Sequence, residues 1–234
     1  MKLSVEFLGL YGAADVTARA EVEWPPHPDR LYQALVDAAL PQDRPALAWL
    51  EEQPAPDVDC GPAVELSWGR EGKTYVPTNY PKDTLPELRS KQPRQFPMAV
   101  PEGPVRYVWP AEPPPDVFES IKRAVDRVTH VGRSDSLAML QLEAGVSPCR
   151  WSEREDGPLF MRVPVRGRLQ QLDTAFAAGQ RSPTAPQVRY GNAQEAARSS
   201  GPWEGLVAMR LIKPVAVEHV AQACDAPRRA VQAG

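Results

Sequence analysis

Hydrophobic and polar residues alternate along the first ten residues of the chain. Leu3, Val5 and Phe7 fall on one face, which predicts a half-buried strand within residues 2–10. Further on, apolar residues recur every three or four positions and predict an amphipathic helix over 29–40. The patterns along the rest of the chain predict strands at 18–24, 105–109, 136–143, 160–165 and 206–212, a hairpin of 63–68 with 74–77, and helices at 45–52, 116–129 and 169–178.

These elements follow one another as strand, helix, hairpin, strand, helix and strand. This order is compatible with a ferredoxin-like or RNA-recognition-type core, whose elements follow as β-α-β-β-α-β. We therefore expect an α+β fold, with a ferredoxin-like or RRM-like core and an antiparallel sheet. The core domain is expected within residues 1–216, and residues 217–234 are expected to be a tail.

Proline supplies 27 of the 234 residues, which is roughly twice its average share. Because proline is excluded from helix interiors and central strands, a regular helical bundle or solenoid is not expected. Hydrophobic residues at 42% and charged residues at 24% equally exclude wholesale disorder. Residues 77–104 are too proline-broken for core structure and too long for an ordinary loop, and such stretches are usually functional or disordered.

The formal net charge of −3 conceals an uneven distribution along the chain. Residues 1–65 carry 4 basic and 12 acidic side chains, whereas residues 66–234 carry 23 basic and 18 acidic ones. Residues 162–189 hold five arginines, no lysine and a single aspartate. A guanidinium is a planar fork of donors that suits phosphate or base recognition. The distribution is therefore compatible with a nucleic-acid partner, and equally with an ordinary solvated surface.

Several common kinds of chemistry find no support in the sequence. Cys60, Cys149 and Cys224 are far apart, and the three histidines lack metal-ligand spacing, so neither a disulfide scaffold nor a metal site is expected. Glycine-rich phosphate-binding loops and nucleophile elbows are absent, so we expect no cofactor. We find neither a signal peptide nor an apolar run of membrane-spanning length, which predicts a cytoplasmic protein.

His130 has two interpretations. It lies between the end of a predicted helix and Gly132, which can adopt the left-handed conformation that terminates helices. A histidine at that end also favours the helix dipole, so its role can be structural. In the other interpretation, His130 and Arg133 project from a turn towards a phosphate. A role as general acid or base in RNA cleavage needs a positioned partner, which the sequence does not identify.

Two stretches resemble a CRISPR-associated family. Residues 23–36, Glu-Trp-Pro-Pro-His-Pro-Asp-Arg-Leu-Tyr-Gln-Ala-Leu-Val, resemble the N-terminal strand-to-helix motif of the Cas-five/Cas-six fusion subunit of subtype I-U, also called I-G. Residues 127–136, Arg-Val-Thr-His-Val-Gly-Arg-Ser-Asp-Ser, resemble its Gly-Arg-Ser turn and, more broadly, the Gly-Arg turn of Cas-five proteins. Lesser similarities occur at 75–79 and 105–109.

This resemblance implies a non-catalytic RNA-binding subunit of the RAMP superfamily. Such subunits hold the 5′ handle of the guide RNA (crRNA) and cap the filament of backbone subunits of the seventh Cas family. The expected partners are thus the guide RNA, those backbone subunits and the large subunit of the surveillance complex, with target DNA met only indirectly. A protruding thumb typically kinks the guide, and the basic excursion at about 70–104 is the candidate thumb. The candidate RNA contacts are Arg133, His130, Lys82, Arg89, Lys91, Arg94, Arg30, Arg166 and Arg168.

The fusion family is about twice as long as this chain. Its Cas-six-like half is expected to process precursor RNA, but here the chain ends at Gly234 and lacks the glycine-rich loop typical of Cas-six proteins. Nuclease activity is therefore not transferred. The resemblance implies that the chain is either the Cas-five portion of a longer product, with residues 217–234 at the start of the missing C-terminal processing domain, or a split subunit. Two alternatives stay open: a metal-independent endoribonuclease that processes repeat RNA, as some Cas-five proteins of another subtype do, and a protein–protein scaffold without RNA contact.

Overall fold

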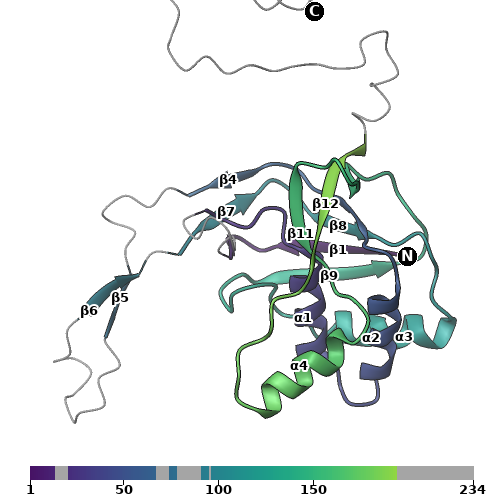
Figure 1. Ribbon diagram of the computed structural model, residues 1–234. Coiled ribbons are helices and arrows are strands. Elements are labelled where there is room, and N and C mark those ends of the chain that lie inside the picture. Colours follow the sequence, from purple (N-terminus) through teal and green to yellow (C-terminus); the bar gives the residue numbers. More distant parts are fainter. Residues whose placement is uncertain (14–20, 67–73, 78–90, 95, 194–234) are drawn as a thin grey trace, which may run out of the picture. The chain divides into compact units, whose positions relative to one another are not determined.

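The computed structural model describes residues 1–13, 21–66, 74–77, 91–94 and 96–193 (Figure 1). Contacts divide the chain into two units, Met1–Glu195 and Ala196–Gly234. The second unit lies outside the described residues, as does the predicted strand at 206–212.

A β-α-β-β-α-β core is present, in which β3 stands in place of the predicted hairpin. Its elements in chain order are β1 (Lys2–Phe7), α1 (Pro28–Ala38), β3 (Asp57–Asp59), β8 (Val105–Val108), α3 (Pro115–Val125) and β9 (Ala138–Glu143). Their strands lie side by side in the order β3-β8-β1-β9, and every neighbouring pair is antiparallel. Because β8 lies between β1 and β3, the first β-α-β unit is split, as in ferredoxin-like folds. The fold is thus the mixed α+β fold that the sequence predicts.

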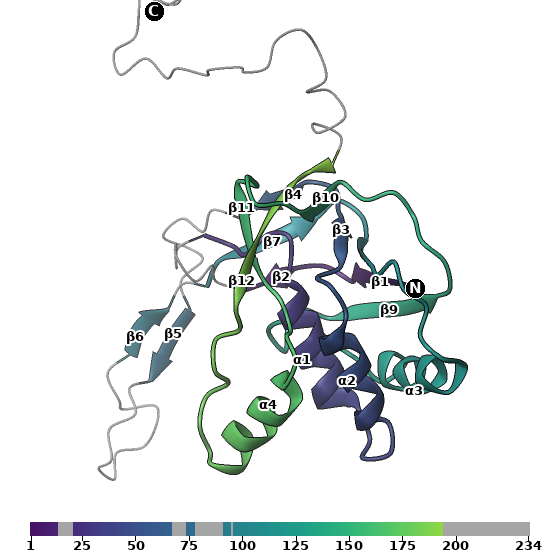
Figure 2. The same ribbon diagram turned by 45° about the vertical axis from the view of Figure 1, so that its right-hand side comes forward.

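A single row of apolar side chains crosses the centre of this sheet. The register places Leu142, Leu3, Tyr107 and Val58 on neighbouring strands, and all four are buried. Figures 1 and 2 show the helices on one side of the sheet. The apolar faces of α1, α2 (Arg44–Glu52) and α3 pack in the same core as this row, and burial of apolar surface of this kind is the main stabilising contribution to folding.

The sheet continues beyond β3 to seven strands. β10 (Trp151–Glu153), β12 (Gln187–Asn192) and β11 (Leu159–Arg162) follow in that spatial order, and α4 (Arg168–Ala177) connects β11 to β12. The sequence predicted β11 and α4 but not β3, β10 or β12. β12 lies in a stretch that the sequence assigned to a basic loop. Its strand conformation depends on pairing with β10 and β11, which the local pattern of residues does not indicate.

Two smaller sheets differ from the hairpin predicted for 63–68 with 74–77 and add strands to the proline-rich stretch at 77–104. β4 (Ala63–Glu65) pairs with β7 (Met98–Pro101), which also pairs with β2 (Tyr11–Gly12). β5 (Thr74–Pro77) pairs instead with β6 (Lys91–Arg94), so the predicted hairpin of 63–68 with 74–77 is wrong. A turn-forming sequence between two strands does not decide which strands pair. β6 and β7 tolerate proline because Pro93 lies in a two-stranded ribbon and Pro101 at a strand end.

Two predicted elements are shorter in the structure. α3 ends at Val125 rather than near 129, because the Arg127 and Val128 N–H groups bond to carbonyls only three residues back and tighten the last turn. Of the strand predicted at 18–24, residues 21–24 contain a single bridge position at Val22, and residues 14–20 lie outside the described part. No helix among the described residues is long and apolar enough to cross a membrane.

Candidate functional site

The predicted Gly-Arg turn comprises residues 130–137 and connects α3 to β9. An isolated antiparallel bridge joins its first and last residues, and within it the Ser136 N–H donates to the Arg133 carbonyl at 2.9 Å. Gly132 has a φ of +95°, a conformation that glycine adopts without the steric penalty of a side chain. The turn thus requires glycine at its centre and places Arg133 directly after it.

This turn packs against β2. The Gly12 N–H donates to the Ser136 hydroxyl at 2.9 Å, and a side chain at Gly132 would place its Cβ 3.2 Å from the Gly12 carbonyl oxygen and 3.2 Å from the Tyr11 ring. Arg30 of α1 lies on the same side of the turn, with its Cδ 3.4 Å from that Cβ position. The two stretches that carry the family resemblance, 23–36 and 127–136, therefore meet here.

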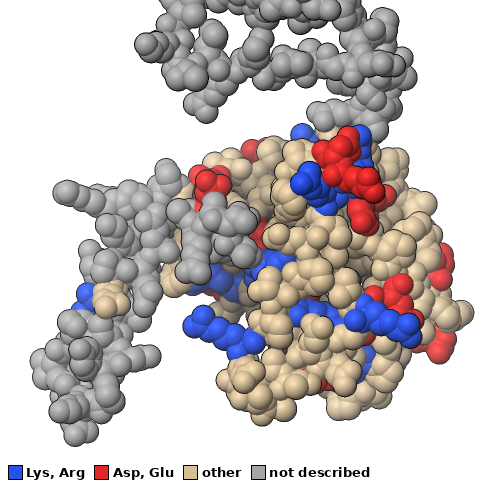
Figure 3. All heavy atoms as spheres, in the orientation of Figure 1, with Lys and Arg blue, Asp and Glu red and all other residues tan. Residues whose placement is uncertain are grey.

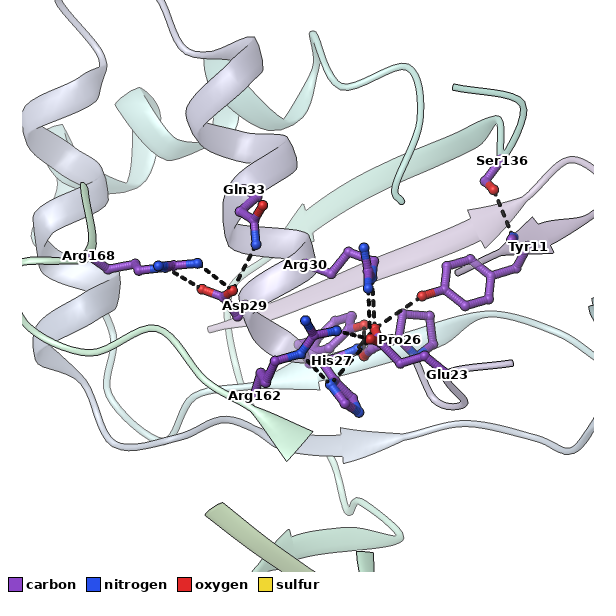
Figure 4. Close-up of polar contacts among 12 residues, drawn as sticks. Tyr11, Glu23, Pro26, His27, Asp29, Arg30, Gln33, Ser136, Arg162 and Arg168 are labelled. Carbon is purple, nitrogen blue, oxygen red and sulfur yellow. Dashed lines mark hydrogen bonds and ion pairs between the residues drawn. The ribbon is translucent and has the colours of Figure 1, made fainter. Parts of the chain in front are cut away.

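Glu23 lies at the centre of a buried polar cluster just before α1 (Figure 4). Its side chain is fully buried, and Arg30 binds it through two hydrogen bonds, Nε to Oε1 and Nη2 to Oε2, both 2.7 Å long. Arg162, at the end of β11, donates to the same carboxylate, and the His27 backbone N–H and the Tyr11 hydroxyl donate to Oε1 at 3.1 and 3.3 Å. We call these five residues the Glu23 cluster.

The electrostatics of the cluster keep Glu23 ionised. Burial by itself raises the pKa of a carboxyl group. Here the hydrogen bonds from Arg30 and the charges of His27, Arg30 and Arg162 outweigh burial, and the pKa of Glu23 is lowered. Two guanidiniums share this one carboxylate, so the ion pairs leave one positive charge in excess.

Asp43 forms a second cluster of the same kind. It lies just before α2 and is fully buried, and it pairs with two arginines near the end of α3. Arg123 Nε lies 2.8 Å from its Oδ1, and Arg127 Nη1 lies 3.1 Å from its Oδ2. These three residues form the Asp43 cluster, which again combines two guanidiniums with one carboxylate. Its arginines are 46% and 37% exposed, so the excess charge faces solvent.

A cavity of about 310 Å³ lies between the two clusters. Arg30 of the Glu23 cluster and Arg127 of the Asp43 cluster line it together with His130 and Gly132 of the turn. Asp37 of α1 contributes a carboxylate to the same wall, so the two excess charges leave the surroundings net positive. We call this the basic cavity. Its charge and its several N–H donors suit a phosphate group.

Arg133 directly follows Gly132, which lines the basic cavity, and its side chain is oriented by two neighbours. Its guanidinium carbon lies 3.9 Å from the centre of the Phe96 ring, and its Nε and Nη2 donate to the Asp135 carboxylate at 3.1 and 3.2 Å. The side chain remains 36% exposed. A cation–π contact and a two-point ion pair hold an arginine in one orientation while leaving part of it accessible.

The remaining predicted RNA contacts fall into three groups. Arg168 is fully buried against Asp29 (Figure 4), which does not fit a contact with RNA and corrects the prediction for this residue. Arg166 is 86% exposed, and Lys91 is exposed on β6. Lys82, Arg89 and the side chain of Arg94 lie outside the described part of the chain, so the predicted contacts there stay predictions.

Basic side chains gather on one visible face of the first unit. In Figure 3, most blue Lys and Arg spheres cross the middle of this face at the height of α1 in Figure 1, whereas red Asp and Glu spheres lie mainly towards its upper and right-hand margins. The distribution on this face is therefore more polarised than the net charge of −3 indicates.

The sequence interpretation missed the Asp43 cluster and the role of Arg162. One signal was available: Arg123 and Arg127 are four residues apart on a predicted helix, so they lie on the same face. Their partner could not be identified, because Asp43 precedes α2 and meets them only through the packing of α2 against α3. Among the described residues no group of three or more potential ligands could hold a metal ion.

Comparison with known proteins places the chain in a family. The search of curated proteins finds no match. The family model described as CRISPR-associated protein, GSU0054 family, matches residues 1–233. A match over almost the entire sequence shows that the chain belongs to the GSU0054 family of CRISPR-associated proteins, and that its role lies in CRISPR defence.

Proposed function

We propose that the protein is a non-catalytic guide-RNA-binding subunit of a type I CRISPR surveillance complex. In this role it holds the 5′ handle of the guide RNA and caps the filament of backbone subunits, as the resemblance to the Cas-five half of the subtype I-U/I-G fusion subunit implies. The stretch at about 70–104 serves as the thumb in this proposal. Membership of a CRISPR-associated family and the ferredoxin-like core both support it.

The observation that carries the proposal is the basic cavity between two clusters with excess positive charge. Glu23 and Asp43 are each shared by two arginines, and one arginine of each cluster lines the cavity. The carboxylates hold the guanidiniums in place without cancelling their charge. A phosphate that enters between Arg30 and Arg127 gains charge-assisted hydrogen bonds from donors that are already ordered.

Arg133, His130 and Arg30 therefore remain proposed RNA contacts, and Arg127 joins them. Arg166 stays in the set because its guanidinium is accessible. Arg168 leaves the set because burial prevents it from reaching RNA. Lys91 remains a candidate contact of the thumb, together with Lys82, Arg89 and Arg94.

The test is the salt dependence of binding to single-stranded repeat RNA. Each phosphate neutralised contributes roughly 0.7 to the slope of log affinity against log salt for single strands. We expect Arg127→Gln to weaken binding and to reduce the slope by about that amount. Asp43 keeps Arg123 as its partner in this variant, so the fold should persist.

Arg106→Gln is the matched control. Arg106 is 40% exposed against 37% for Arg127, and it also pairs with a single aspartate, Asp59. It lies on β8, away from the basic cavity, so both affinity and slope should equal those of the wild type. A flat salt dependence of the wild type, or equal effects of the two substitutions, contradicts the proposal.

One observation is compatible with the endoribonuclease alternative. His130 lines the same cavity as Arg30 and Arg127, and the Thr129 hydroxyl lies 3.2 Å from its Nδ1. Incubation of the chain with repeat RNA in the presence of a chelator separates the two functions. Specific cleavage that disappears in His130→Ala supports the nuclease, whereas binding without cleavage supports the proposed subunit. Absence of guide-RNA crosslinks to this chain in the assembled complex supports the scaffold instead.

A further inference from the structure

Phe176 is the most exposed of the large hydrophobic side chains in the described part of the chain, at 88% of its surface. It lies near the end of α4, whose residues Leu169, Leu172 and Ala175 turn towards the protein interior. Single exposed apolar residues are common on protein surfaces. Phe176 differs from such a residue because it lines a cavity of about 440 Å³, which we call the Phe176 cavity.

The helix that presents Phe176 is firmly anchored. Arg168, its first residue, makes a buried two-point ion pair with Asp29 of α1. The Glu51 carboxylate accepts hydrogen bonds from the Gly167 and Leu169 N–H groups at 3.2 and 2.8 Å, which caps the start of the helix. The start of the helix that presents Phe176 is therefore fixed to α1 and α2.

The Phe176 cavity shares a wall with the basic cavity. Gln33 and Asp37 of α1 line both of them, and no other described residue does so. A ligand with a negatively charged group in the basic cavity can thus continue along α1 into the Phe176 cavity.

The charges of the two cavities differ. The Phe176 cavity contains Asp37 together with Arg44, which is already paired with Asp173, so its ionised groups sum to a net negative charge that disfavours phosphate. Amide groups of Gln33 and Gln180 and the hydroxyl of Ser182 complete its polar lining. An aromatic ring beside amides, a hydroxyl and carboxylates suits a flat, uncharged group with hydrogen-bonding edges.

We infer that the Phe176 cavity binds an unpaired nucleobase, stacked on Phe176, whose neighbouring phosphate occupies the basic cavity. The inference rests on the proposed function and adds a base contact to a phosphate contact. Stacking of a base on an aromatic side chain accepts any base, and Gln33, Asp37 and Gln180, which line the cavity, carry the kinds of polar groups that can hydrogen-bond to base edges.

The experiment is a scan of single-stranded repeat RNA in which each nucleotide in turn is replaced by an abasic site. For the full wild-type chain, removal of the base at one position should weaken binding about 5-fold or more, as expected for the loss of one stacked base. Phe176→Ala should weaken binding of the intact RNA to a similar degree. The same abasic position should then have no further effect, because the base and the ring act as a pair.

Three controls separate this effect from general loss of binding. Phe176→Trp should retain affinity, because tryptophan also offers a stacking surface. Phe160→Ala removes another exposed phenylalanine, 47% exposed on β11, and should leave binding and the abasic profile unchanged. The salt slope should be the same in Phe176→Ala and the wild type, because no phosphate contact is removed.

The outcomes distinguish this inference from the proposed function. If Arg127→Gln weakens RNA binding while Phe176→Ala does not, or if the abasic penalty persists in Phe176→Ala, the base site is wrong and the proposed function stands. If the wild type binds no RNA, both are wrong. If Phe176→Ala leaves RNA binding intact but prevents assembly with another subunit, the cavity belongs to a protein interface and the base site is overturned.

Discussion

Asp29 and Arg168 form a two-point ion pair between positions 139 residues apart in the sequence. Arg168 Nε and Nη2 donate to the two carboxylate oxygens of Asp29, each at 2.8 Å, and both side chains are almost fully buried. Gln33 also donates to Asp29, at 2.8 Å (Figure 4). The pair joins the first turn of α1 to the first turn of α4 and holds together two elements that line the Phe176 cavity.

Removal of one partner from this pair should be strongly destabilising. Arg168→Ala leaves the Asp29 carboxylate buried without its counter-ion, and we expect the free energy of unfolding to fall by about 3–5 kcal/mol. Chemical denaturation measures the change. Arg166→Ala is the matched control, since Arg166 is 86% exposed and exposed substitutions usually change stability by less than about 0.5 kcal/mol. Equal stabilities of the two variants would contradict the role assigned to Arg168.

Glu23 should make stability depend on pH in the acidic range. The pKa of Glu23 is lower in the folded protein than its ordinary value of 4.5, so the unfolded state binds its proton more readily. The contribution of Glu23 is therefore present above about pH 4.5 and is lost as the pH falls through its lowered pKa. Glu23→Gln should flatten this part of the stability curve, measured by denaturation at a series of pH values. Glu155→Gln, at an exposed position, should retain the wild-type curve.

Gly132 should tolerate a side chain less well than another glycine with the same backbone conformation. Gly132→Ala and Gly103→Ala both force alanine into the left-handed region, at φ of +95° and +100°, which costs roughly 1–2 kcal/mol. At Gly103 no atom lies within 4 Å of the new Cβ, whereas at Gly132 the Gly12 carbonyl and the Tyr11 ring lie 3.2 Å away. Gly132→Ala should therefore lower the melting temperature further. It should also weaken RNA binding, because it displaces the turn that positions Arg133.

Cys60 should be unreactive in the folded protein. Burial, with the neighbouring Asp59 charge, raises the pKa of the Cys60 thiol to about 11, and the thiolate is the form that reacts with alkylating reagents. Iodoacetamide at pH 7.5 should label the Cys60 peptide slowly in buffer and rapidly in guanidinium chloride, as quantified by mass spectrometry. Rapid labelling under native conditions would show that Cys60, which follows β3, is more accessible than its 7% exposure indicates.

Local sequence patterns determined the central elements of the fold. Leu3 and Val5 alternate with polar residues in β1, and the apolar spacing in α1 and α3 defines one buried face each. Such patterns are visible from one segment at a time, because each depends on which side chains a single strand or helix turns inwards. The short strands escaped prediction for the opposite reason. β3 has one buried side chain, Val58, and its strand conformation depends on pairing with β8 and β10.

The candidate site shows the same division. The sequence alone determined that Gly132 and Arg133 form a turn and that arginine is concentrated in residues 162–189. Only the tertiary structure decided which arginines remain accessible: Arg168 is buried by Asp29, whereas Arg166, two residues earlier, is exposed. The physical reason is that a guanidinium's role depends on the carboxylates that folding brings beside it, and those carboxylates come from distant parts of the chain.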